Sequence, residues 1–372
     1  MHRHSNQRGF SLLEMVFVMG IMLVVTTAVL SMLRDTLKFS NVTYEMSDSQ
    51  QNLRTAHESI NRDIMSAGDG LLGLNNIKVS KLFVNNYLTT TPVADPVITT
   101  ISPLTIVTSD NNVASGTAIP GIAPSVNVRS SPALTDRLTI LDMADTTAPA
   151  NNVNFPAVTL DPGGLGAINV NSSGYNVTVD ATTYAAVSVN DIYFFSSSAG
   201  QTLGRVTAKV GPNTLRFYTS DTYGLNTIGA NGSLKIVANT PGIGIGPGTL
   251  PVTMTRLFLI HYFVDQNGLL YRRVFGIGGG VGFSDSVIAE HVTDLQFNFY
   301  LKAATAGAAA QPTTTQLNIS QQSRVREVEV TIKTETAHNV LNGAPQETKM
   351  TTTTAIRNMQ FRESQQPTSN PG

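Results

Sequence analysis

The stretch that decides the fold lies near the amino terminus and reads FSLLEMVFVMGIMLVVTTAVLSML over residues 10–33. Residues 15–33 contain no charged side chain, and Arg34 ends the run. About 20 apolar residues in a helix, at about 1.5 Å per residue, span a bilayer core of about 30 Å. The stretch therefore predicts a membrane-spanning helix. Its basic flank, MHRHSNQRG (1–9), predicts that the long remainder of the chain lies on the outer side of the membrane.

Two ordinary interpretations of such a segment are a secretory signal peptide and a plain signal anchor. A signal peptide has a shorter apolar region with a small-residue cleavage site after it, and no such site follows Leu33. A plain anchor does not account for Glu14, which lies inside the apolar stretch. A carboxylate in hydrocarbon costs several kcal/mol, so such residues usually have a partner and a role.

The amino terminus resembles that of type IV prepilins: a short basic leader ends in Gly9, Phe10 follows, and Glu14 is the fifth residue after the leader. The resemblance implies that prepilin peptidase cuts between Gly9 and Phe10 and N-methylates Phe10. Cleavage creates a positive amine that is unfavourable in lipid. Glu14 of one subunit would pair with the amine of a neighbour, so that one ion pair replaces two costs of desolvation.

The same resemblance implies the partners and the location. The partners are prepilin peptidase, other major and minor pilins through the N-terminal helix, and the inner-membrane pilus assembly platform. The protein is expected in the bacterial inner membrane, with a single pass and its head in the periplasm, and then in the pilus at the cell surface.

The sequence after the span continues without a helix breaker, because residues 34–67 contain no proline. Gly68 then tolerates the left-handed conformation of a helix end. We expect one helix from Phe10 to about Ala67, roughly 85 Å long, whose second half packs against a globular head. A transmembrane helix followed by a separate soluble helix is the alternative. The apolar stripe of the second half recurs at three- and four-residue steps, at Leu53, Ala56, Ile60, Ile64 and Ala67.

From Leu71 onward the pattern alternates with period two between turn residues, which is typical of antiparallel β-structure. Residues 89–131 are rich in Thr, Pro, Ser and Ala and predict an irregular loop. The predicted strands of this first block are 77–84, 136–143, 175–180, 191–197, 204–210, 214–220 and 233–239.

The second β block is better marked. Residues 255–276 predict a hairpin around Asp265-Gln266-Asn267-Gly268, where Asn-Gly favours a tight turn. Residues 287–301 predict a short turn followed by a strand, and 302–316 predict a low-complexity loop. Residues 323–336 alternate with a phase slip near Glu327, and 349–359 form the last predicted strand.

The order of these segments resembles PilW-like minor pilins and, more distantly, the J-type pseudopilins of type II secretion. The matching residues are 59–68, Tyr271-Arg272-Arg273, 287–300, 325–332 and 355–358. The resemblance covers 1–84 and 251–363, whereas 85–250 matches no family.

It implies an α+β, pilin-like fold in which a long N-terminal transmembrane and stalk helix packs on an antiparallel β-sheet head with a large β-rich insert. The expected parts are a leader (1–9), a transmembrane helix (10–33), its periplasmic extension (34–68), a β-rich head with insert (69–250), a pilin-like β region (251–363) and a tail (364–372).

Composition limits the chemistry. Only 13% of the 372 residues are charged, against about a quarter in globular proteins, and the formal net charge is −1. This near-neutral balance disfavours nucleic acid as a partner, because phosphate binding needs concentrated Lys and Arg. The chain has no cysteine, which excludes disulfides, thiolate nucleophiles and cysteine-ligated metals.

No motif indicates an enzyme or a cofactor. The glycine-rich segments 241–248 and 276–282 do not fit a phosphate-binding loop, so hairpin loops are the better interpretation. The spacing of the histidines is not that of metal ligands, so the sequence predicts no metal-binding or catalytic residue. Calcium binding in one of the loops stays an open alternative. The histidines outside the leader are His57, His261, His291 and His338, and the scattered aspartates, which suit turns, are Asp161, Asp180, Asp191, Asp221 and Asp265.

Three functions are weighed. The first is a minor pilin that takes part in pilus assembly or initiation. The second is a tip adhesin that uses the 85–250 block, with a type II secretion pseudopilin as a further alternative. A membrane-anchored periplasmic enzyme is disfavoured, because no site for it is present.

Overall fold

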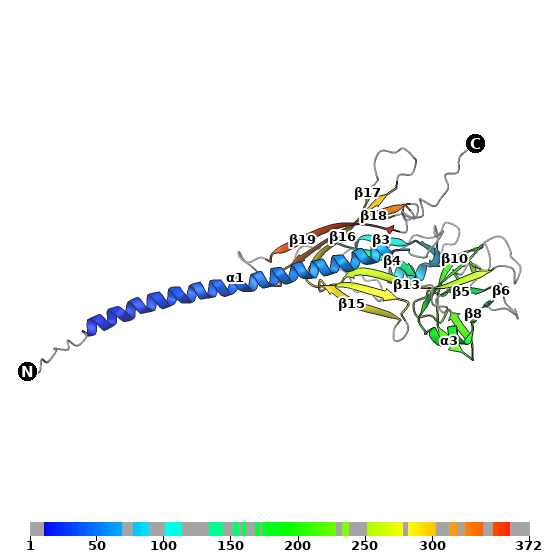
Figure 1. Cartoon of the computed structure of the whole chain (residues 1–372), viewed down its shortest axis with the longest axis horizontal. Coiled ribbons are helices and arrows are strands. Elements are labelled where there is room, and N and C mark those ends of the chain that lie inside the picture. Colours follow the sequence, from blue (N-terminus) through cyan, green and yellow to red (C-terminus); the bar gives the residue numbers. More distant parts are fainter. Residues whose placement is uncertain are drawn as a thin grey trace, which may run out of the picture.

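The structure, a computed structural model, describes residues 11–68, 77–88, 101–113, 134–143, 152–155, 158–160, 168–171, 173–227, 233–237, 251–277, 282–302, 313–317, 321, 324–337 and 345–357. A single long helix leads from the amino terminus into a β-rich head at its far end (Figure 1). The predicted α+β architecture, with a long helix packed on antiparallel sheets, is confirmed.

Helix α1 spans Leu12–Ser66 without interruption, which is about 82 Å at 1.5 Å per residue. The prediction of one continuous helix is therefore confirmed over the described residues. The helix ends where Gly68 adopts a φ of 70° and its amide donates to the Leu141 carbonyl at 2.9 Å. A Cβ at Gly68 would lie 2.6 Å from the Ile106 side chain, so this end needs glycine for conformation and for space.

The central sheet is organised by one long strand, β13 (Val252–Val264). Its carboxyl-terminal half pairs with β14 (Leu270–Phe275) and with β4 (Thr135–Met143). Its amino-terminal half pairs with β9 (Ile192–Ser197) and with β5 (Asn152–Phe155). The sheet is completed by β3 (Val107–Val113) beside β4, β15 (Phe283–Ala289) beside β14, and β10 (Gly200–Arg205) beside β9.

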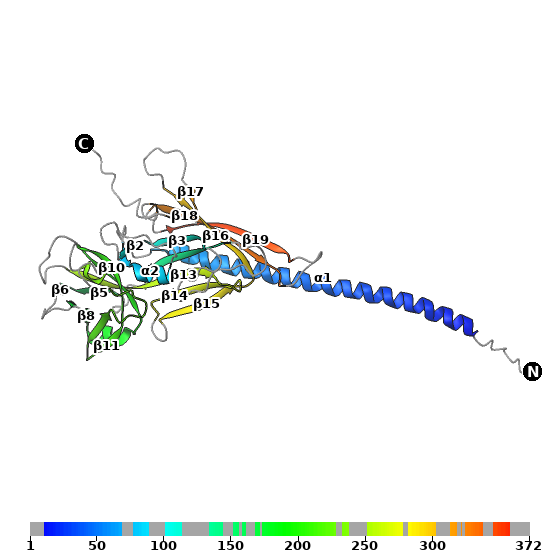
Figure 2. The same ribbon diagram turned by 180° about the vertical axis from the view of Figure 1, so that it is seen from behind.

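A second sheet covers the opposite side of α1. Its order is β17 (Thr313–Thr314), β16 (Val292–Leu301), β18 (Val325–Glu335) and β19 (Glu347–Ala355). Helix α1 contacts β18 and β19 of this sheet as well as β4 and β15 of the central sheet. The carboxyl-terminal half of the helix therefore lies between two sheets, as Figures 1 and 2 show.

The two sheets meet at a buried carboxylate, Asp136 of β4. Its Oδ2 accepts from the backbone N–H of Phe297 in β16, and its Oδ1 accepts from that of Asn112 in β3, both at 2.8 Å. Burial raises the pKa of Asp136 to about 7, against the opposing effect of these two hydrogen bonds. One side chain thus satisfies two strand amides at the seam between the sheets.

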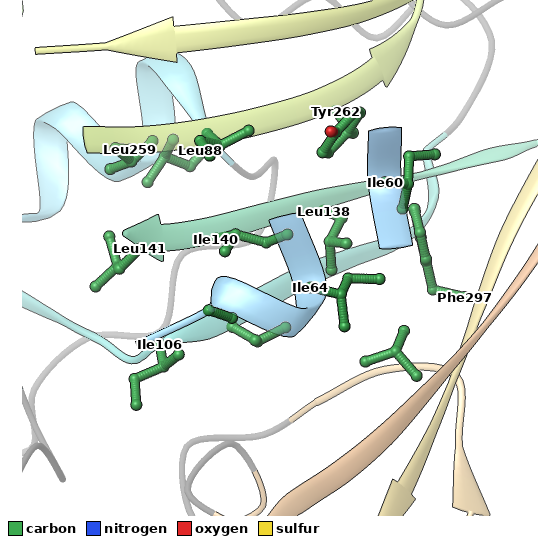
Figure 3. Packing of buried hydrophobic residues seen from close by; sticks show 14 of the residues in the cluster. Ile60, Ile64, Leu88, Ile106, Leu138, Ile140, Leu141, Leu259, Tyr262 and Phe297 are labelled. Atoms are coloured by element: carbon green, nitrogen blue, oxygen red, sulfur yellow. The ribbon is translucent and has the colours of Figure 1, made fainter. Parts of the chain in front are cut away.

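The main core forms around the helix stripe that the sequence predicted. The five stripe residues are each at most 1% exposed. Figure 3 shows Ile60 and Ile64 of the helix facing Leu138 and Ile140 of β4, with Phe297 of β16 on the other side. Helix and both sheets therefore share one hydrophobic core.

A distal lobe has its own sheet and core. The sheet order is β11 (Ala208–Val210), β12 (Thr214–Tyr218), β8 (Gly174–Thr178), β7 (Ile168–Asn171) and β6 (Val158–Leu160), with only β6 and β7 parallel. Its separate core places Tyr193 and Phe195 of β9 against Phe217 of β12. The lobe lies at the end of the molecule farthest from the amino terminus (Figure 1).

Five short elements complete the described fold. Strand β1 (Ile77–Ser80) pairs with β2 (Ile101–Leu104) and also borders β10, where the Thr202 hydroxyl donates to the Lys78 carbonyl. The others are α2 (Lys81–Tyr87), α3 (Ala181–Ala186) and the 3-10 turn η2 (Ser233–Lys235).

Several local predictions in the first β block were wrong. Residues 77–84 form β1 followed by α2, because the helix stacks Phe83 on Tyr87 at 5.6 Å and buries it in the core. Residues 233–239 contain η2 instead of a strand. The predicted strand 204–210 is broken between β10 and β11, where the Val206 amide bonds to Asp191. The predicted loop 89–131 includes β2 and β3, whose strand structure depends on pairing with distant segments.

The second block follows the sequence more closely. The hairpin is confirmed as β13 and β14, and Gly268 has a φ of 74°. The Asp265 carboxylate accepts from the amides of Asn267 and Leu269 inside the turn. The phase slip near Glu327 coincides with a shift in the pairing of β16 with β18, where Tyr300 opposes Glu327 and Leu301 opposes Val325. The phase slip in the sequence therefore corresponds to a β-bulge in the strand pair.

Candidate functional site: the protruding half of helix α1

The first half of α1 stands free of the head. Every residue from Ser11 to Phe39 is exposed, and Ser49 is the first buried residue of the helix. The side chain of Phe17, for example, is 71% exposed. An 18-residue window of this segment has a mean hydropathy of 2.5, and none of the window is buried. Such an apolar surface is stable only inside a membrane or against other apolar helices.

Two threonine hydroxyls within this surface are bonded inside the helix. Thr26 Oγ1 donates to the Met22 carbonyl at 2.7 Å, and Thr27 Oγ1 donates to the Leu23 carbonyl at 2.8 Å. A hydroxyl satisfied in this way does not need water. These two threonines are therefore compatible with hydrocarbon, whereas the Glu14 carboxylate is not.

Glu14 lies in the first turn of α1, and its carboxylate is exposed. Phe17, Val18 and Ile21 follow on the same face at helical spacing. Within the described part of the chain, the carboxylate has no ion-pair partner. The helix amino terminus favours a negative charge but does not neutralise it. An acid in this position needs a cation from outside the described residues.

The other two predicted site residues, Gly9 and Phe10, lie outside the described residues. The described helix begins directly after them, with Ser11 as the N-cap residue and the amides of Glu14 and Met15 bonded to the Ser11 carbonyl. Cleavage, methylation and the pairing of Glu14 with the new amine therefore stay predictions.

An ion pair between a buried acid and a half-buried arginine fixes the second half of the helix to the head. Arg272 of β14 donates to both Asp63 carboxylate oxygens, from Nε at 2.6 Å and from Nη2 at 3.1 Å. The Tyr262 hydroxyl donates to Asp63 Oδ2 at 2.5 Å. Burial first, and then the Asp63 charge, raise the pKa of the Tyr262 phenol. For Arg272 the raising effect of Asp63 on the pKa outweighs the lowering effect of burial.

Both residues of this pair lie within segments that resemble pilin segments, but local sequence patterns do not pair them. The available signal was Asp63 itself, an acid inside the apolar stripe between Ile60 and Ile64. A buried acid on such a stripe requires a counter-ion. Which of the chain's basic residues supplies it depends on the pairing of helix and hairpin, more than 200 residues apart.

Two further polar contacts attach the helix to the second sheet. His57 Nδ1 lies 2.9 Å from the Thr352 hydroxyl, and Ser49 Oγ lies 2.6 Å from that of Thr334. Burial lowers the pKa of His57, although a hydrogen bond with the Met350 backbone opposes the shift. The ring is therefore held neutral between helix and sheet.

The other candidate residues have structural roles in the described part of the chain. Asp180 caps α3 through the amides of Thr182 and Thr183. Asp191 pairs with Arg256, and Asp221 pairs with Arg205. His291 lies exposed in a turn with a φ of 55°, whereas Asp161 and His338 lie outside the described residues. Among the described residues, no group of three or more His, Cys, Asp or Glu side chains could hold a metal ion.

Comparison with known proteins adds one match. The prokaryotic N-terminal methylation motif matches residues 4–30, which include Gly9, Phe10 and Glu14. No curated protein and no solved structure matches the chain. Residues 4–30 thus carry a prepilin-type cleavage and methylation motif, and the long helix packed against antiparallel sheets is a pilin-like architecture.

Proposed function

We propose that this protein is a minor pilin that prepilin peptidase processes and that takes part in the assembly or initiation of a type IV pilus. The observation that carries the proposal is the protruding half of α1. Its apolar surface contains one unpaired carboxylate among the described residues, within the segment that matches the methylation motif. A PilW-like identity is part of this proposal.

The first step is hydrolysis of the peptide bond between Gly9 and Phe10. It removes the basic leader and leaves an ammonium group on Phe10, which stays cationic after N-methylation. The amine then lies four residues before Glu14 in the sequence. Because the carboxylate of one subunit meets the amine of a neighbour in the apolar environment, each neutralises the other.

The mature amino terminus tests this step. The full chain would be expressed with and without prepilin peptidase, and its terminal peptide analysed by mass spectrometry. We expect methylated Phe10 as the first residue only when the peptidase is present. Gly9→Val should block processing, whereas Gly20→Val should not, because a side chain at Gly20 meets no atom within 4 Å. A mature terminus at any other residue contradicts the proposal.

A second candidate function is adhesion at the pilus tip through residues 85–250. The distal lobe supports it, because the lobe has a separate core and lies at the end opposite the membrane segment (Figure 2). The block cannot be removed cleanly, since it contains β4 and β9, which pair with β13. Surface substitutions are therefore the better test.

The outer face of the lobe offers such positions. Arg216 lies over the Tyr218 ring at 5.2 Å, and the Tyr218 hydroxyl donates to Asn176 at 2.8 Å. If the lobe binds a surface, Tyr218→Ala should reduce adhesion and leave pilus number unchanged. Tyr300→Ala, on the outer face of the other sheet, is the matched control.

Rescue of protein secretion instead of piliation, in strains that lack this protein, would assign it to a type II secretion filament.

A further inference from the structure

A buried cation, Arg137, has no hydrogen-bond partner among the described residues and lies on the face of the central sheet that points away from α1. Successive residues of a strand point to opposite faces. Leu138 and Ile140 of β4 face the helix core, so Arg137 and Thr139 face the other way (Figure 3). The Arg137 side chain is fully buried, at 0% exposure. Its Nε, Nη1 and Nη2 atoms have no hydrogen-bond partner within the described part of the chain.

Other unpaired polar atoms lie around this guanidinium. His261 of β13 is opposite Thr139, and its Nδ1 lies 2.9 Å from the Thr139 hydroxyl. Its Nε2 is buried without a partner among the described residues, and so are the hydroxyls of Thr108 and Thr135. Strand register places all of these side chains on the face of Arg137. We call Arg137, His261, Thr108 and Thr135 the Arg137 cluster.

The neighbouring charges do not compensate for the burial of the Arg137 cation. Burial lowers its pKa to about 10, and the charge of Asp110, its neighbour on β3, opposes the shift. Arg137 is therefore still cationic at neutral pH. No described residue accepts a hydrogen bond from its guanidinium nitrogens. The next cation, Arg273, is held by both carboxylate oxygens of Asp285 at 2.7 and 2.8 Å. A buried ion without hydrogen bonds costs several kcal/mol, so each such group requires an explanation.

We propose that the Arg137 cluster binds one small oxyanion, such as sulfate, phosphate or a simple carboxylate, as a structural ligand of the head. A guanidinium presents a planar fork of N–H donors that matches two oxygens of such an anion. His261 adds an Nε2–H donor when its Nδ1 accepts from Thr139, and the two threonine hydroxyls can also donate. Complete burial of Arg137 restricts the ligand to an ion that is enclosed as the sheets assemble. The same burial excludes the binding of a macromolecule to Arg137.

The test is thermal unfolding of the full chain in detergent, in chloride buffer and in buffers of equal ionic strength with sulfate, phosphate or acetate. A ligand at about 100 times its Kd should raise the Tm by about 5 °C or more. Ion chromatography of the denatured protein measures any anion that copurifies. We expect either a Tm increase in at least one of the three buffers or one equivalent of copurified oxyanion.

Arg137→Met removes the charge at similar length and should abolish both signals. Arg272→Met is the matched control, because it removes a half-buried arginine from the opposite face and should retain both signals. If Arg137→Met does not fold, Thr135→Val should fold and weaken the anion response. The proposal is overturned if the wild-type protein shows neither signal, if Arg137→Met responds like the wild type, or if Arg137→Met is more stable than the wild type in every buffer.

Discussion

Each half of α1 contains an acid in apolar surroundings, and only one of these two acids has a partner among the described residues. Asp63, in the buried half, receives three hydrogen bonds from Arg272 and Tyr262 of its own chain. Glu14, in the exposed half, has no ion-pair partner within the described residues. A buried acid must be neutralised in either case. The buried half is therefore complete within one subunit, whereas we propose that the exposed half is completed by another molecule.

The largest effect is expected at Glu14. Glu14→Gln keeps the size of the side chain but removes the charge, so it should abolish piliation in a complementation assay while cleavage of the leader continues. Glu58→Gln, an exposed glutamate on the buried half of the same helix, is the control and should be piliated normally. Normal pili with Glu14→Gln would mean that no amine depends on this carboxylate.

Asp63→Ala should be the most destabilising change in the head, because it leaves Arg272 half-buried without its acid and Tyr262 without its acceptor. We expect the free energy of unfolding in urea to fall by about 3–5 kcal/mol. Asp35→Ala, on the exposed half of the helix, should change it by less than about 0.5 kcal/mol. Adding Arg272→Met to Asp63→Ala should restore part of the loss, and the absence of such rescue would contradict the assigned pairing.

The apolar residues of the two halves allow a parallel comparison. Ile60→Ala creates a cavity between helix and sheets and should lower the free energy of unfolding of the head by about 2–5 kcal/mol. Val24→Ala, on the protruding half, should leave it unchanged and affect only membrane or filament packing. Equal destabilisation by both variants would show that the protruding half contacts the head.

Acid–base behaviour should separate the seam of the two sheets from the helix interface. The folded protein holds a proton on Asp136 up to about pH 7, whereas the unfolded chain releases it near 3.8. The contribution of this group to stability is therefore full below about pH 4 and is lost as pH rises towards 7. Urea titrations between pH 4 and 7 should show this slope, and Asp136→Asn should remove it while lowering stability overall, because one strand amide loses its acceptor.

The smallest effect is expected at His57. Its pKa is lowered by burial, so the unfolded chain binds the proton more strongly than the folded chain. Its contribution is present above pH 6.5 and is lost as pH falls below that value. His57→Gln should make unfolding less sensitive to acid in this range, whereas His291→Gln, an exposed control, should not. The pKa of His261 is also lowered, by burial and by Arg137 and Arg273. His261 is present in both variants and still contributes to the dependence of stability on pH.

The sequence predicted those parts of the fold that depend on local patterns. The helix stripe, the β13–β14 hairpin and the bulge near Glu327 are each readable from periodicity or turn chemistry within a few residues. The strands 77–84 and 233–239 were predicted from the same kind of alternation, and there long-range packing overrode it. Short alternating segments do not specify a strand unless a partner strand is available.

The sequence by itself determined the exposed apolar segment, the position of Glu14 and the buried stripe of α1, because hydropathy and helical periodicity are properties of neighbouring residues. Only the tertiary structure decided that Arg272 neutralises Asp63, that Asp136 joins two sheets, and that Arg137 is enclosed without an acceptor among the described residues. Each of these depends on which distant strands pair. A polar residue at a position that the sequence predicts to be buried requires a partner, but the fold decides which residue supplies it.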